Sequence, residues 1–261
     1  MMKHAIFLTV LVALGLAAPT VTADDAVNAN IVRLVKGQYT YQTTKAQRLR
    51  GYEDWTLTIH PDGSRTMMAL VNNLDADVQF NMVHRVAATF RPLETFVTHW
   101  VGGESRGSGH FVVDGLRLRA TVTGQVSRTI QVPDRFSMHP HPVSTDSWRT
   151  WDYDKDRGGV QTARVYNVAV APNAAAPLMG VLEDQTVEWL GSETITVPAG
   201  TFDTDHYKLR GNSDMWIAGP DRIAIKYLFA DLDREYVLTT YESATRSDAS
   251  GLAQTQATRR P

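Results

Sequence analysis

The sequence predicts an all-β protein: a single antiparallel curved sheet or (half-)barrel with a long irregular lid segment. Stretches in which apolar and polar residues alternate recur at short intervals, as they do in half-buried strands. No strong helical pattern follows the apolar stretch at the N-terminus. The longest alternation covers residues 77–90 and exceeds an ordinary strand, which favours a barrel or a strongly curved sheet.

Residues 1–23 have the features of an export signal. Lys3 and His4 precede an apolar stretch over 5–18, and the segment ends in small residues before Ala23. We expect cleavage after Ala23 and a protein of the periplasm or a secreted one. The apolar stretch is too short to span a bilayer comfortably, so no membrane span is expected.

The remaining chain is expected to form one β-barrel-like domain over 24–244, followed by a polar, disordered tail over 245–261. No cysteine occurs, so neither a disulfide nor a lipid-modified cysteine is possible. The chain has 26 lysine and arginine residues against 28 aspartate and glutamate residues, without a basic run. Such a balance excludes the electrostatic footprint of a nucleic-acid-binding protein.

The expected strands follow one another in the manner of a meander. In the first half they cover residues 37–44, 52–59, 77–90, 94–102, 109–115, 116–124 and 125–132. The region 133–176 is rich in proline, glycine and charged residues, and we expect a lid or long loop over one barrel mouth, with short strands over 147–153 and 162–170. Regular alternation returns over 184–197, 201–211, 214–219, 222–230 and 234–243.

The C-terminal stretches VPAGTFDTDHYKL, DMWIAGPDRIAIKY and REYVLTTYE carry a family resemblance over residues 185–243. This region resembles the terminal hairpins of secreted bacterial proteins grouped as domain of unknown function 3108 (DUF3108). Those proteins are similar to the periplasmic lipoprotein-carrier-like (LolA/LolB-like) β-barrel group. The resemblance implies an incomplete barrel that can hold acyl chains.

The most unusual local chemistry is the run His139-Pro140-His141-Pro142 in the irregular region. A residue that precedes proline avoids helical torsions, so both imidazoles are expected on a stiff, extended segment. An imidazole titrates near neutral pH, and a neighbouring carboxylate fixes its tautomer, which suits general acid–base catalysis.

The candidate catalytic residues are therefore His139, His141, Asp146 and Tyr153, with Asp152 as an alternative carboxylate. Tyr153 is the candidate donor to a developing oxyanion. A proline-braced loop with solvated imidazoles is the alternative without a function. A His-x-His pair also supplies two metal ligands, but no histidine-rich helix or cysteine supports a metal site, and none is expected.

Aromatic side chains are expected to line an apolar interior, where a cavity is the default binding site. His99 and Trp100 are adjacent on a strand, so only one of them can face that cavity. The candidate ligand-binding residues are Tyr39, Tyr41, Trp55, Phe80, His99, Trp100, Trp148 and Trp216.

The leading functional hypothesis is a periplasmic β-barrel that binds a hydrophobic small molecule or lipid in this cavity. The alternative is a cofactor-free lyase, isomerase or hydratase that uses histidine and aspartate in the same cavity. A structural envelope protein is a third possibility. No cofactor is expected, because no phosphate-binding loop, dinucleotide fingerprint or nucleophile elbow occurs.

Overall fold

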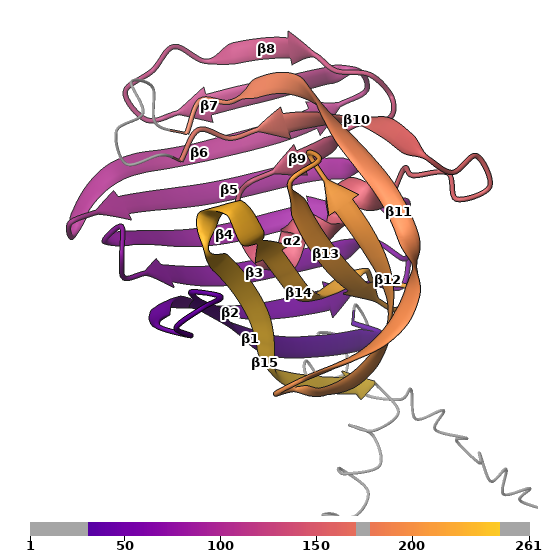
Figure 1. The fold of residues 1–261 in the computed structure, drawn as a ribbon. Coiled ribbons are helices and arrows are strands. Elements are labelled where there is room, and N and C mark those ends of the chain that lie inside the picture. The colour runs from indigo at the N-terminus through magenta and orange to yellow at the C-terminus, as the bar shows by residue number, and fades with distance from the viewer. Residues whose placement is uncertain (1–30, 171–177, 246–261) are drawn as a thin grey trace, which may run out of the picture.

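The computed structural model describes residues 31–170 and 178–245, which form a single open, curved sheet of fifteen strands. This architecture confirms the expected all-β, barrel-like class (Figure 1). The predicted export signal lies outside the described residues. The predicted tail does so after Thr245, which is the last residue of the final strand.

The first half of the chain forms a meander that starts in the middle of the sheet and ends at one edge. Its strands are β1 (Arg33–Gln42), β2 (Leu49–Ile59), β3 (Arg65–Asn73), β4 (Val78–Val86), β5 (Pro92–Val101), β6 (Glu104–Asp114), β7 (Arg117–Val122) and β8 (Arg128–Gln131).

The second half starts at the opposite edge and returns to the middle. It contains β9 (Ser137–His139), α2 (Val143–Asp146), the 3-10 helix η1 (Ser147–Thr150), β10 (Val160–Asn167), β11 (Val181–Val197), β12 (Gly200–Leu209), β13 (Ser213–Ala218), β14 (Ile223–Phe229), the 3-10 helix η2 (Ala230–Leu232) and β15 (Arg234–Thr245).

The two halves join where the first strand pairs with the last. β1 and β15 are antiparallel over their full lengths, from the pair Arg33 and Thr245 to the pair Gln42 and Glu235. Neighbouring strands are antiparallel throughout except β9 and β10, which are parallel. The sheet remains open between the edges β8 and β9.

β4 shows why these segments become strands. Its inward residues Val78, Phe80, Met82, His84 and Val86 are buried, whereas the residues between them are exposed. This pattern is the alternation expected of a sheet with one dry face. The strand is shorter than predicted, because the backbone turns after Val86 and does not continue to residue 90.

The irregular segment differs from expectation in its position. Residues 136–150, called the plug below, are almost entirely buried, and α2 contacts both β3 and β14 (Figure 1). The plug therefore fills the interior between the two half-sheets and does not cover a mouth. Apolar side chains such as Phe136, Met138 and Trp148 drive this burial.

The short strand expected over residues 147–153 is wrong, because η1 and a turn occupy this region. Hydroxyl groups in the plug bond back along the chain. The Thr145 hydroxyl donates to the Pro142 carbonyl at 3.0 Å, and the Thr150 hydroxyl donates to the Ser147 carbonyl at 2.7 Å. Such local bonds favour turns and helical torsions over a strand.

Candidate functional site

A cavity of about 350 Å³ lies at one end of the barrel, where β1 and β3 end and β4 and β15 begin. We call it the mouth pocket. Its size falls within the range of roughly 300–1,000 Å³ that ligand pockets occupy. It is lined by Tyr41, Val71, Asn73, Ala76, Val78, Phe80, His139, His141, Val143, Asp146, Val170, Arg210, Tyr227, Phe229, Arg234 and Tyr236.

The aromatic walls of the mouth pocket are held by contacts with one another. The ring centroids of Tyr41 and Tyr236 are 4.4 Å apart, and those of Tyr227 and Phe229 are 4.3 Å apart. Phe80 stacks on His99 at 4.7 Å. These contacts restrict the side chains before any ligand binds, which reduces the entropic cost of binding.

The plug brings two predicted catalytic residues into contact. His139 ends β9, Asp146 ends α2, and the His139 Nε2 atom is 2.7 Å from an Asp146 carboxylate oxygen. The Arg149 guanidinium lies 3.7 Å from the other oxygen. Burial acts to raise the pKa of Asp146, but its contact with His139 and the charge of Arg149 lower it below its usual value. Burial also lowers the pKa of His139, so Arg149 is the charged partner of this buried carboxylate and His139 is its hydrogen-bond partner.

His141 lies beside this pair as a neutral imidazole. Its ring centroid is 4.1 Å from that of His139, and burial holds its pKa well below the usual value. The Nε2 atom is 2.7 Å from the Val168 carbonyl oxygen, which can only accept a hydrogen bond. In the neutral ring the proton therefore sits on Nε2, and Nδ1 is an acceptor.

A buried carboxylate that the sequence analysis missed, Glu53, holds two residues of the pocket wall in place. Glu53 accepts hydrogen bonds from the Tyr41 hydroxyl at 2.6 Å, the Val143 N–H at 2.7 Å and the Ser144 N–H at 3.0 Å. Burial raises its pKa to about 7, although these bonds act against the shift. Glu53 thereby ties β1 and β2 to the start of α2. The sequence did contain an indication of this role. Glu53 lies two residues before Trp55, so both side chains face the buried side of β2.

The fourth predicted catalytic residue, Tyr153, lies elsewhere. Its hydroxyl donates to the Gly159 carbonyl at 2.7 Å, its ring packs against Tyr207, and it does not line the mouth pocket. Asp152, the alternative carboxylate, pairs with Arg135. The structure thus joins His139, His141 and Asp146 and places Tyr153, the expected oxyanion donor, away from them.

The predicted ligand-binding residues are distributed over several places. Tyr41 and Phe80 line the mouth pocket, and His99 is buried behind Phe80. The remaining interior residues lie in the core outside the pocket; these are Tyr39, Trp55 and Trp148.

Trp100 and Trp216 lie on the outer face of the sheet. Trp100 alternates with the buried His99 and is 37% exposed. Trp216 lines an outer hollow of about 460 Å³, and its indole N–H donates to the Glu193 carboxylate at 2.7 Å. Neither side chain can contact a ligand in the mouth pocket.

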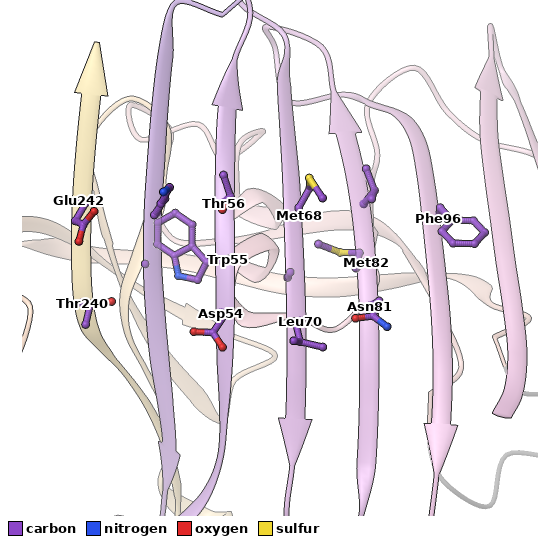
Figure 2. A pocket seen from close by; sticks show the side chains of 14 residues that line it. Asp54, Trp55, Thr56, Met68, Leu70, Asn81, Met82, Phe96, Thr240 and Glu242 are labelled. Carbon is purple, nitrogen blue, oxygen red and sulfur yellow. The ribbon is translucent and has the colours of Figure 1, made fainter. Parts of the chain in front are cut away.

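A larger hollow of about 540 Å³ lies on the outer face of β15 and β1–β5, and we call it the outer groove (Figure 2). Polar residues such as Asp54 and Glu242 line one side of it, and Met68 and Phe96 lie further along the sheet. Met68 is 54% exposed and Phe96 is 42% exposed. The groove holds no buried polar cluster comparable to the one beside the mouth pocket.

Two further features bear on the kind of site. Within residues 31–170 and 178–245, no group of three or more histidine, cysteine, aspartate or glutamate side chains is placed to hold a metal ion. In the same part of the chain, no helix is long and apolar enough to cross a membrane.

No family model and no curated protein matches this chain. Among solved structures it is similar to a β-barrel-like protein of domain of unknown function DUF1849 from Brucella abortus, with 7% identity, a TM-score of 0.48, and coverage of 82% of this chain and 99% of that one. It is also similar to a DUF1089 family protein from Pseudomonas aeruginosa, with 13% identity, a TM-score of 0.41, and coverage of 67% and 89%. Neither is a DUF3108 protein or a lipoprotein carrier, so that resemblance stays a prediction.

Proposed function

We propose that this barrel-like protein binds a hydrophobic small molecule or lipid in the mouth pocket. The observation that carries the proposal is a cavity of about 350 Å³ in which an aromatic and aliphatic wall faces a compact set of polar side chains, Asn73, His139, His141, Asp146, Arg210 and Arg234. Pockets with this composition are typical of small-molecule sites, in which apolar walls supply affinity and a few polar groups fix orientation.

The plug gives the pocket a closed floor. Val143 and Asp146 of the plug line the pocket, and the plug continues to the opposite end of the barrel, where the Trp148 indole donates to the Asp221 carbonyl at 3.1 Å. A ligand therefore enters and leaves by the same mouth.

The expected export signal and the resemblance to lipoprotein carriers support a location in the periplasm or outside the cell. Both are inferences from sequence, and they agree with a protein that shelters an apolar compound from water. Recovery of the mature protein from the periplasmic fraction, with its N-terminus at residue 24, would test the location.

The binding proposal is tested by displacement of the neutral fluorescent probe phenylnaphthylamine and by native mass spectrometry of the purified protein. Phe229→Ala removes part of the pocket wall, and we expect it to weaken probe binding by roughly tenfold, in line with the loss of a buried aromatic contact.

Phe96→Ala is the matched control, because it makes the same change on the exposed outer face. We expect unchanged probe affinity for this variant. If Phe96→Ala weakens binding and Phe229→Ala does not, the ligand occupies the outer groove and the proposal for the mouth pocket is wrong.

A further inference from the structure

We infer that the ligand of the mouth pocket is an anionic amphiphile, an aliphatic chain that ends in a carboxylate or phosphate group. The chain lies against the aromatic walls, and the acidic group binds Arg210 and Arg234. This inference rests on the proposed binding function and adds the chemical class of the ligand.

The charged side chains that line the pocket carry a net positive charge. Among its lining residues the only carboxylate is Asp146, which already has His139 at 2.7 Å and Arg149 at 3.7 Å. His141 is neutral, because burial holds its pKa well below the usual value. The charged groups that remain for a ligand are the two guanidinium groups of Arg210 and Arg234.

Arg234 has the stronger case as an anion ligand. It is the first residue of β15, it is exposed, and no ion pair joins it to any carboxylate within the described ranges. It lines the pocket together with Tyr236, whose ring forms part of the apolar wall. Arg234 therefore places an uncompensated cation where the wall meets solvent.

Arg210 adds a second cation from another part of the sheet. It follows β12 in a left-handed conformation with a φ of 54°, which turns the chain at the barrel mouth. Its Nη2 atom lies 3.8 Å from the Glu183 carboxylate and 3.4 Å from His139 Nδ1. Both distances are long for a charge-assisted bond, and a guanidinium has five N–H donors, so most of its binding capacity is unused.

The two parts of the site require one molecule with two properties. Guanidinium groups bind carboxylates and phosphates through paired hydrogen bonds. The walls formed by Phe80, Phe229 and Tyr236 favour a hydrocarbon chain. A neutral oily molecule leaves Arg234 without an anionic partner and Arg210 with only its long contacts to Glu183 and His139, and a cationic amphiphile is repelled by both arginines.

The test compares ligands that share one chain and differ in the head group. Dodecanoate, dodecyl phosphate, dodecanol and dodecyltrimethylammonium each compete with phenylnaphthylamine for the full-length mature protein. We expect the two anions to bind at least tenfold more tightly than dodecanol, because hydrogen bonds to a charged group are stronger than those to a neutral one. The cation is expected to bind most weakly. The ratio between dodecanoate and dodecyl phosphate then identifies which acid the site prefers.

Arg234→Gln and Arg210→Gln are each expected to weaken anion binding roughly tenfold and to leave the affinity for dodecanol unchanged. Arg119→Gln, on the exposed face of β7, is the control and should alter nothing. Equal binding of dodecanol and the anions overturns the inference about the head group but leaves the proposed function intact. If the probe does not bind and native mass spectrometry detects none of the four compounds on the protein, both proposals are wrong.

Discussion

Glu53 illustrates what a single buried charge can do in this fold. Its carboxylate satisfies two backbone N–H groups at the start of α2, which have no partner inside so short a helix. It also fixes the Tyr41 hydroxyl, so one side chain connects the plug, the sheet and the pocket wall. The energetic cost appears in its raised pKa of about 7, since burial disfavours the charged form.

Glu53→Gln tests this role. At about pH 5 the wild-type carboxyl is protonated, but both of its oxygens can still accept hydrogen bonds, whereas an amide nitrogen cannot. One backbone N–H group at the start of α2 therefore loses its acceptor, and we expect a loss of about 1–3 kcal/mol in the free energy of unfolding. The wild-type carboxyl has a folded pKa of about 7 against 4.5 unfolded, so its ionisation costs stability as pH rises between these values. The amide does not titrate, so the difference in stability should move by about 3 kcal/mol in favour of the variant between pH 4.5 and pH 7, which removes or reverses the deficit. Urea unfolding across this range checks both values, and a deficit that is independent of pH would contradict the assignment.

His84 has the opposite pH dependence. Its ring is buried against Trp148 with Nδ1 2.7 Å from the Thr95 hydroxyl, and burial lowers its pKa to about 4 from 6.5. As pH falls, the His84 imidazole becomes protonated in the unfolded chain before it does so in the folded protein. Protonation therefore favours unfolding and lowers the stability by about 3 kcal/mol between pH 6.5 and pH 4. His84→Gln should abolish that loss, which unfolding curves at several pH values would measure. A variant that still loses stability as steeply as the wild type would show that His84 is not the responsible group.

At the scale of elements, the plug fills the space between the two half-sheets and so forms much of the hydrophobic core. Its residues contact both half-sheets, and the side chain of Trp148 packs between His84 and Phe90 at the end opposite to the pocket. The stability of the barrel should therefore depend on the plug more than on any outer residue.

Trp148→Ala is expected to lower the free energy of unfolding by about 3–5 kcal/mol, because it leaves a large cavity in the core. Trp100→Ala makes the same change on the outer face, and it should cost less than about 1 kcal/mol. Chemical denaturation of both variants provides the comparison. Equal effects would mean that the plug packs only loosely in solution.

The strands could be predicted from the sequence because each carries its own pattern. In β4 the alternation from Val78 to Val86 specifies which face is buried without reference to any other segment. The plug has no such signal, since α2 is four residues long and shows less than two helical turns. Several of its polar groups bond to Glu53, Asn167 and Asp221, which are distant in sequence.

The candidate site also combines residues that the local sequence reveals with residues that only the fold brings together. His139, His141 and Asp146 were recognisable because they are close together in the chain and chemically unusual. Glu53, Arg210 and Arg234 belong to the site only because the sheet curves and brings β2, β12 and β15 to one mouth. Tyr153 was misplaced for the converse reason, since proximity in sequence to the histidines does not place it beside them in space.

At the scale of the whole molecule, the two ends of the described chain meet inside the sheet. Arg33 is the direct register partner of Thr245. We expect a circular permutant that joins these positions through a short linker and opens in the exposed turn at Asp156 to fold with near-wild-type stability. A permutant opened at Ser144, inside the plug, should not fold. Circular dichroism and thermal melting distinguish the two, and similar melting curves would contradict this view of the topology.

The pairing of β1 with β15 also determines the order in which a growing chain can be completed. Strands β1–β8 can associate as neighbouring hairpins during synthesis, but the second edge of β1 stays bare until the segment from Arg234 onward has emerged. A nascent or truncated polypeptide without that segment exposes a long, unprotected strand edge, which is a template for intermolecular pairing. The last strand to be synthesised is therefore the one that protects the first from pairing with other chains.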